Sequence, residues 1–506
     1  MELSDATSKK LVKGAGVSFI GKLISTGFKY FTQVVLAWLL GAESFGLYTL
    51  GITIYHFGEL FSRMGLDSGV VRYVSIYYSS GDKNRLKGVL LQAIGLPLLS
   101  GIVFGSTLFF ASDPIAQGLF GKPELAPALR IFAIALPVGA ATNVGAFATT
   151  GFQITQYKVY IWELLLPFIN LLLAIVLCTI GFGLQGAAWA WLVALTLALA
   201  ATVYFIGSIF PGIARRSPKP IFESKQLITF SLPLGFGTFA WLILLWTDVL
   251  MLGYFRSASE VGVYRAASQT SLLMNIIAGS LVTVFAPIIA SLYSKGEFEE
   301  MGRVFQTSSR WSFSLTLPLF LIVGVAGKNI LSIFGAEFET GWLPLVILGM
   351  GQLARAGVGG LSNHMLAMSG HQYFKLFADI GLAITNIALN ILLIPLWGVM
   401  GAAVATGVSI TGISMLRAAL VKRALGVGIP LYNWTYLKII VAGTTAALIG
   451  LVVQNWLEPM HFVLSALFTA LVICLCYFGL LLPMGIEEAD QMILVKISKR
   501  LGLFKD

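Results

Sequence analysis

The sequence is poor in charged residues, histidine and cysteine, on which soluble proteins and metalloproteins depend. Only 11% of its 506 residues are charged, and it contains four histidines and three cysteines. A soluble protein of this length needs more polar residues to cover its surface, so a soluble globular fold is excluded. The cysteines lie inside apolar runs, and the histidines are dispersed at 56, 364, 371 and 461. Neither spacing is typical of a metal site or a disulfide framework, and we expect no metal.

Motifs for nucleotide binding and catalysis are also missing. The segment 16–22 (GVSFIGK) fits most of a phosphate-binding loop, but Leu23 stands where that motif needs Ser or Thr. The segment also lies in a long apolar run, with no strand before it. The longest loops predicted on the outer side, about 112–127 and 328–341, are short and mostly apolar. We therefore expect no catalytic residues, no cofactor and no enzymatic activity in this chain.

Apolar residues are what the chain has in abundance, at 57% of the sequence with a mean hydropathy of +0.86. Because a helix crosses the bilayer with about 20 apolar residues, this composition predicts an all-α polytopic membrane protein. About 14 spans are expected, at roughly 14–40, 45–79, 87–111, 128–151, 159–180, 185–210, 227–254, 261–293, 304–327, 341–368, 374–396, 399–421, 437–457 and 461–484. The spans 45–79 and 261–293 exceed the bilayer thickness, so we expect them to bend or to project from it, the first near Gly65 and Gly69.

The basic residues predict the orientation. With the N-terminus placed in the cytoplasm, twenty Lys and Arg fall on that side, against Lys122, Arg256 and Lys328 on the other. This asymmetry follows the positive-inside rule and puts both termini in the cytoplasm. The net charge of +10 is then mainly a topology signal, and we expect no nucleic-acid partner.

The first half of the pattern returns about 215 residues later. The segment 45–48 (FGLY) returns at 261–264 (VGVY), and the Gly-Ala-Ala turn at 186–188 returns at 401–403. Each repeat holds six spans, an even number, which predicts two parallel six-helix bundles related by a pseudo-twofold axis along the membrane normal. The expected domains are an N-terminal bundle, a cytoplasmic linker, a C-terminal bundle, and helices 13 and 14 with a cytoplasmic tail, at 1–210, 211–225, 226–424 and 425–506.

Several ionisable residues lie at membrane depth, where an isolated charge costs about 2.5–3.5 kcal/mol on insertion scales. They should therefore face one another or a wet cavity. We predict a cationic substrate-binding cavity formed by Lys22, Lys29, Arg63 and Arg265. Polar cavity residues, which could also bind a coupling ion, are predicted at Glu59, Asp67, Glu163, Asp248, Asp379 and Asn386.

Lys and Arg outnumber Asp and Glu at these buried positions, which favours a phosphate-bearing substrate. Glu163 and Asn170 return as Asp379 and Asn386, both 216 residues later. Structural alternatives stay open for each group. The lysines of the first span could extend to the membrane surface, the acidic repeat pair could hold helices together, and the charges in 59–67 could form a closed ion network.

The segments around the repeated turns resemble a known family. The segment 36–50 (LAWLLGAESFGLYTL), its counterpart 247–267 and the two Gly-Ala-Ala turns are similar to the polysaccharide biosynthesis branch of the multidrug/oligosaccharidyl-lipid/polysaccharide exporter superfamily. The resemblance covers the whole chain. It implies a V-shaped pair of six-helix bundles that moves undecaprenyl-diphosphate-linked oligosaccharide from the inner to the outer leaflet of a bacterial or archaeal cytoplasmic membrane.

Members of such families act in O-antigen (lipopolysaccharide), capsule or exopolysaccharide assembly, so the implied partners are a polyprenyl-diphosphate-linked glycan, membrane lipid and other glycan-assembly proteins. Coupling to H⁺ or Na⁺ is also implied. Within the same fold, a lipid II flippase and a cation-coupled multidrug exporter remain alternatives. Outside it, the alternatives are a membrane-embedded glycosyltransferase or polysaccharide polymerase, and a scaffold that transports nothing.

Overall fold

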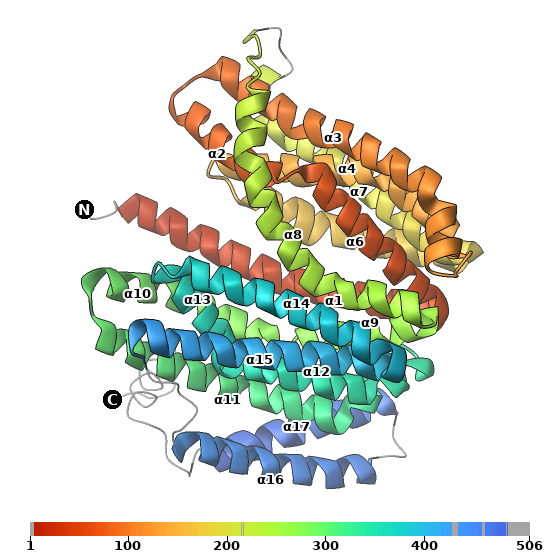
Figure 1. The fold of residues 1–506 in the computed structure, drawn as a ribbon, viewed down its shortest axis with the longest axis vertical. Coiled ribbons are helices and arrows are strands. Elements are labelled where there is room, and N and C mark those ends of the chain that lie inside the picture. The colour runs from red at the N-terminus through yellow and green to blue at the C-terminus, as the bar shows by residue number, and fades with distance from the viewer. Residues whose placement is uncertain are drawn as a thin grey trace. The chain divides into compact units, whose positions relative to one another are not determined.

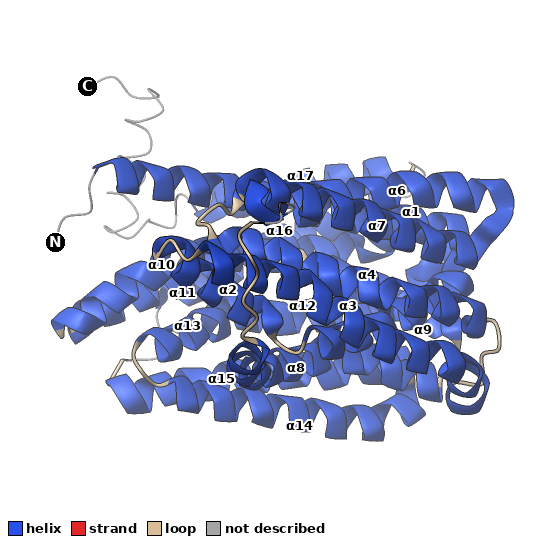
Figure 2. Ribbon diagram, turned by 90° about the horizontal axis from the view of Figure 1, so that it is seen from above, coloured by secondary structure: helices blue, strands red, loops and turns tan. Residues whose placement is uncertain are grey.

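In the described residues, the computed structural model consists of helices joined by short loops, with no strand (Figure 2). The structure describes residues 5–213, 215, 217–427, 434–457, 461–481 and 483, and side chains from Ile24 onward apart from those of 236–245, 283–284 and Gln372. Ten described helical segments are long and apolar enough to cross a membrane. This confirms the prediction of an all-α, multi-pass membrane protein.

The helices follow one another with few long connections. In the first half they are α1 (Asp5–Arg63), α2 (Leu66–Ser79), α3 (Lys83–Asp113), η1 (Pro114–Leu119), α4 (Leu125–Gly151), α5 (Gln156–Val159), η2 (Tyr160–Leu165), α6 (Leu166–Leu177), η3 (Cys178–Phe182), α7 (Gly183–Ile209) and η4 (Pro211–Ile213). In the second half they are α8 (Ser224–Phe255), α9 (Ala258–Leu272), α10 (Asn275–Lys295), α11 (Phe298–Leu331), η5 (Ala336–Gly341), α12 (Trp342–Ala354), η6 (Arg355–Gly359), α13 (Gly360–Met368), α14 (Gln372–Trp397), α15 (Val399–Leu425), α16 (Trp434–Trp456) and α17 (Phe462–Leu481).

Glycine breaks divide the longest helices into the predicted spans. Gly41 has φ 71° and ψ 171° inside α1, so this helix contains the first predicted span and part of the second. Gly65, with φ 70°, separates α1 from α2, as expected for the bend in the second span. Glycine adopts such left-handed angles without the steric cost that other residues bear. The long span 261–293 is likewise broken, between α9 and α10.

The chain divides into two compact units that do not coincide with its linear halves. One unit comprises residues 1–273, 334–344 and 379–406, and the other comprises 274–333, 345–378 and 407–506. In the second unit, α16 and α17 pack together and against α11 (Figure 1). Leu317, Ala446, Ile473 and Tyr477 are buried there in one apolar cluster. The linear domain boundaries and the arrangement as two six-helix bundles stay predictions.

In the first unit, α1 and α9 approach at backbone distance through two glycines that the repeat relates (Figure 1). A Cβ atom on Gly46 would lie 1.7 Å from the carbonyl oxygen of Ala258, and one on Gly262 would lie 2.3 Å from that of Ala42. Ala42 and Ala258 are 216 residues apart, as are the glycines. The contact is therefore reciprocal, which is the pattern that a local twofold axis produces.

Two charged side chains cap helix ends beside this contact. The ammonium of Lys122 donates to the carbonyl oxygens of Gly253 and Arg256, at 2.6 and 2.9 Å, where α8 ends. The carboxylate of Glu337 accepts from the backbone N–H of Ala42 at 3.0 Å, where α1 restarts after its kink. Each charge has the sign that the helix dipole favours at that end. Burial lowers the pKa of Lys122, and the nearby Glu260 carboxylate opposes that shift.

The inner linker is anchored to the first half. Ile221 donates its backbone N–H to the carbonyl of Asn84 at 3.1 Å. The carboxylate of Glu223 pairs with Arg85 at 3.0 Å, and Gln92 donates to Ser224. The described part of the predicted linker 211–225 therefore lies along the start of α3 and leads into α8 on that helix.

We expect Gly46→Ala to destabilise the protein, because the added methyl group would collide with a backbone oxygen that no rotamer change can move. The loss should be at least the 1–3 kcal/mol, roughly, that overpacked cores show. It would be measured as a lower thermal unfolding midpoint of the purified protein. Gly207→Ala on α7 is the matched control, since no atom lies within 4 Å of the new Cβ. An unchanged midpoint for Gly46→Ala would contradict the packing.

Candidate functional site

The end of α1 carries a buried ion network. The guanidinium of Arg63 pairs with the carboxylates of Glu59 at 3.1 Å and Asp67 at 3.8 Å. Their side chains are 12%, 6% and 16% exposed in the order Arg63, Glu59 and Asp67. Helical spacing of four residues puts Glu59 and Arg63 on one face of α1, and the turn at Gly65 brings Asp67 back toward them. Arg63 is therefore already neutralised by two carboxylates.

A chamber of about 190 Å³ lies beside this network. Its lining residues come from α1, α4, η2, α7 and α8, and they are Tyr55, His56, Glu59, Arg63, Asn143, Trp162, Trp191 and Trp246. The ring of His56 lies 5.1 Å from that of Trp246, and the ring of Tyr55 lies 5.9 Å from that of Trp191. The chamber therefore joins charged groups to aromatic walls inside one compact unit.

Arg265 on α9 is the buried cation that lies next to the chamber. Its residue is 8% exposed, and its guanidinium lies 4.2 Å from the ring centre of Trp246. Gln269 accepts from the guanidinium when its carboxamide oxygen faces it. No carboxylate among the described residues lies within ion-pair distance of Arg265. Unlike Arg63, it is a buried charge without a direct counter-ion.

The other predicted cations are placed differently. Lys29 on α1 pairs with Glu163 on η2 at 2.8 Å, and its side chain is 53% exposed. The side chain of Lys22 falls outside the described residues. The predicted cationic cavity is thus represented by one neutralised arginine, one paired lysine at a more exposed place, and Arg265. Arg63 and Arg265 approach the same chamber, whereas Lys29 does not line it.

A second polar group surrounds Asp248 on α8. Asp248 is 4% exposed, and its Oδ2 accepts hydrogen bonds from Tyr264 and, at 2.9 Å, from Thr406. Asn386 donates to Thr406 at 3.1 Å and accepts from Asn390 at 3.0 Å. The structure therefore connects two residues predicted as cavity polar groups, Asp248 and Asn386, through Thr406. Asp379 lies seven residues before Asn386 on the same helix and is partly exposed.

Oxygen atoms around Asp248 are left without donors. Oδ1 of Asp248 and Oδ1 of Asn390 are buried and have no hydrogen-bond partner among the described residues. Buried acceptors that lack a donor are costly unless water or a cation satisfies them. Together with the Thr406 hydroxyl, they form an oxygen-rich group of the kind that hard cations bind. In the described part of the chain, no cluster of three His, Cys, Asp or Glu could hold a metal.

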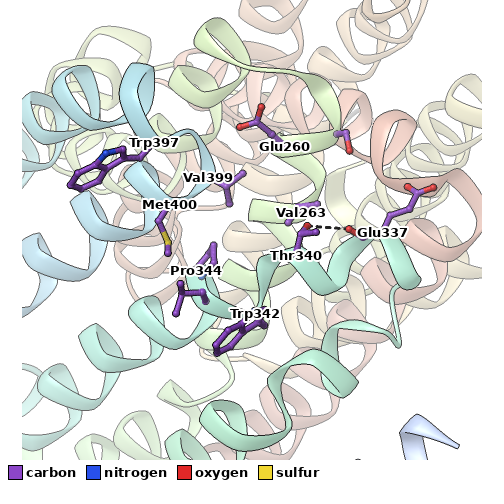
Figure 3. Close-up of a pocket in the computed structure, with 11 residues that line it drawn as sticks. Glu260, Val263, Glu337, Thr340, Trp342, Pro344, Trp397, Val399 and Met400 are labelled. Carbon is purple, nitrogen blue, oxygen red and sulfur yellow. Dashed lines mark hydrogen bonds between the residues drawn. The ribbon is translucent and has the colours of Figure 1, made fainter.

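A larger pocket, of about 570 Å³, lies where α9 and α15 begin (Figure 3). Glu260, Glu337, Trp342 and Met400 are among its lining residues, and Thr340 donates to the backbone oxygen of Glu337. It contains none of the residues predicted for the site. We therefore take the chamber with Arg265, together with the Asp248 group, as the candidate site.

The sequence missed the aromatic walls of this site. Trp162, Trp191 and Trp246 belong to η2, α7 and α8, and nothing in their local sequence distinguishes them from tryptophans in contact with lipid. Trp189 lies two residues before Trp191 and is 42% exposed. Successive positions on a helix point to different faces, but the sequence does not show which face is inner. Asn143, Tyr264 and Thr406 were missed for the same reason.

Comparison with known proteins identifies relatives over most of the chain. Residues 11–293, more than half of the sequence, match the family described as Polysaccharide biosynthesis protein. The succinoglycan biosynthesis transport protein ExoT of Rhizobium meliloti is 22% identical over 68% of this chain and 66% of its own length, just under two thirds. A probable low-salt glycan biosynthesis flippase, Agl15 of Haloferax volcanii, is 28% identical over 34% of this chain and 37% of its own length.

Among solved structures, the chain resembles the lipid II flippase MurJ in an inward closed conformation. The TM-score is 0.69, with 15% sequence identity over 93% of this chain and 98% of that one. At this identity the likeness establishes the fold, which is that of a polytopic transporter. Both the relatives and this neighbour bear names of transporters or flippases.

We expect Arg63→Met to destabilise the protein, because it leaves Glu59 and Asp67 without their cation. Breaking a buried ion pair in this way costs about 3–5 kcal/mol. The double variant Glu59→Gln/Arg63→Met should regain part of the lost thermal unfolding midpoint. Arg130→Met is the control, because the Arg130–Asp113 pair is about half exposed and exposed pairs contribute about 0–1 kcal/mol. Equal midpoints for Arg63→Met and Arg130→Met would show that the network is not structural.

Proposed function

Because the chain belongs to the polysaccharide biosynthesis protein family, we propose that it is a flippase for a polyprenyl-diphosphate-linked oligosaccharide. It moves the glycan head group from the inner to the outer leaflet of a bacterial or archaeal cytoplasmic membrane by alternating access. Both termini face the cytoplasm in this proposal. The glycan then enters a cell-surface polysaccharide, and other glycan-assembly proteins supply and consume it.

The buried Arg265 carries the proposal. A guanidinium that is 8% exposed and lacks a direct carboxylate counter-ion is suited to an anionic ligand. Arginine binds phosphate through several donors in a fixed plane, and such charge-assisted hydrogen bonds are stronger than neutral ones. The diphosphate therefore binds at Arg265. Lys29 contributes from its more exposed position, where it can exchange Glu163 for the phosphate.

Arg63 has a different role in this proposal from Arg265. Since Glu59 and Asp67 already balance its charge, it organises the wall of the chamber and does not bind the diphosphate. The sugars occupy the polar chamber, and the polyprenyl chain stays in the lipid. An inside-negative potential favours outward movement of a head group of charge about −2, by roughly 4–5 kcal/mol per 100 mV if it crosses the full field.

A monovalent cation, Na⁺ or H⁺, resets the empty carrier at the Asp248 group. Asp248 is a buried carboxylate with one oxygen unpaired, and the amide oxygen of Asn390 is unpaired beside the same network. Binding of a cation there would neutralise a buried charge and so favour a conformation in which the group is closed. Asp379 and Glu163 are weaker candidates, because Asp379 is more exposed and Glu163 already pairs with Lys29.

Removing the cations should separate their contributions. In proteoliposomes with a fluorescent polyprenyl-diphosphate-linked glycan, Arg265→Met should lower the flipping rate by about 10- to 100-fold, the value of one or two charge-assisted hydrogen bonds. Lys29→Met should lower it less, because that lysine is paired and exposed. Arg130→Met serves as the control. Wild-type rates in both variants would remove the cationic site but leave the transporter, whereas an inactive wild-type protein would refute the flippase itself.

Asp248→Asn should abolish the dependence of flipping on the coupling cation while keeping the shape of the side chain. Rates would be measured with Na⁺ replaced by choline and, separately, with an imposed pH gradient, which distinguishes Na⁺ from H⁺. Asp379→Asn is the matched control and should keep the dependence of the wild-type protein. If Asp248→Asn responds to both cations as the wild type does, the coupling site lies elsewhere.

A further inference from the structure

We propose that the aromatic chamber is the subsite for the first sugar of the substrate, the ring that is attached to the diphosphate. This inference rests on the proposed function and assigns one part of the ligand to one cavity. Three observations support it: the chemistry of the walls, two unpaired buried polar atoms, and the balance of charge around the chamber.

The walls combine flat apolar rings with hydrogen-bonding groups. Trp162, Trp191, Trp246 and Tyr55 supply the rings, and Glu59 and Asn143 supply the polar atoms. A sugar ring has the complementary surface, since its C–H faces pack against aromatic rings while its hydroxyls form hydrogen bonds around the edge. A mostly apolar pocket with a few placed polar groups is the usual design of a small-molecule site.

Two buried atoms in these walls lack the hydrogen bonds that they require. Neither Nε1 of Trp162 nor Oδ1 of Asn143 has a hydrogen-bond partner among the described residues. The first is a donor and the second an acceptor. A hydroxyl group both donates and accepts, so neighbouring hydroxyls of one sugar satisfy both atoms. Leaving such groups unpaired costs about 1–3 kcal/mol each, which favours an occupant with hydroxyls.

The charges exclude the diphosphate from the chamber but place it nearby. Glu59 and Asp67 balance Arg63, so this wall attracts no anion. Trp246 lines the chamber and also lies against the guanidinium of Arg265, at 4.2 Å. A diphosphate at Arg265 therefore adjoins a sugar in the chamber. An organic cation is disfavoured, because Arg63 and Arg265 lie on two sides of the space.

The volume limits how much of the glycan enters. About 190 Å³ accommodates a single sugar ring, so the remaining sugars must extend beyond the chamber. The protein would then be selective for the first sugar and tolerant of the sugars that follow it.

Binding of short-chain analogues to the purified full-length protein tests the assignment. The probes are farnesyl diphosphate and farnesyl-diphosphate-linked glucose, galactose and N-acetylglucosamine, measured by calorimetry. The wild type should bind at least one sugar-linked probe about 10-fold more tightly than farnesyl diphosphate, as expected for one or two hydrogen bonds and ring stacking. Trp162→Phe and Asn143→Ala should each reduce this preference below about 3-fold while leaving the affinity for farnesyl diphosphate unchanged.

Trp189→Phe is the matched control, since Trp189 lies on α7 near Trp191 but is 42% exposed. A wild type without sugar preference, or variants that keep it, would overturn the subsite and leave the flippase standing. Variants that weaken farnesyl diphosphate equally would also overturn it, by assigning the chamber to the diphosphate. Competition by tetraphenylphosphonium that the variants lose would assign the chamber to organic cations. If the wild type binds none of the diphosphate probes, the proposed function fails together with the subsite.

Discussion

The reciprocal contact of Gly46 with Ala258 and of Gly262 with Ala42 is the constraint on which the candidate site depends. Only glycine allows α1 and α9 to approach until backbone meets backbone, because any Cβ would occupy the space of a carbonyl oxygen. Arg265 follows Gly262 by three residues and is thereby held against the first half of the chain. Trp246 then lies within ring distance of both His56 and Arg265.

The repeat supplies similar backbone geometry on both sides of this contact, but the chemistry differs. Lys122 and Glu337 follow the related segments 120–121 and 334–335, and each caps a helix end near the turn between two spans. One is a cation because it meets carbonyl oxygens, and the other is a carboxylate because it meets an N–H. A fold with twofold character can thus carry opposite charges at related positions, since each charge answers the helix end that it touches.

Ion pairing, more than the number of charges, decides which cation can bind substrate. The chain brings several basic residues into the membrane region, but Arg63 and Lys29 have carboxylates within 3.1 Å. Arg265 has an indole face and an amide in the corresponding places. The fold by itself does not separate a glycan flippase from a multidrug exporter. A buried arginine without a counter-ion favours an anionic ligand, and the acidic group at Asp248 is separate from the chamber that Arg265 adjoins.

The sequence determined the class of this protein and the positions of its spans, because hydrophobic length, glycine breaks and repeated segments are local properties of the chain. It also identified Asp248, Asn386 and Arg265 as buried polar residues, since charge at membrane depth is visible in one dimension. Only the tertiary structure decided which charges pair and which tryptophans line the chamber. Those contacts join α1 to η2, α4, α7, α8 and α9, and the distances between such elements depend on the packing of side chains far apart in the sequence.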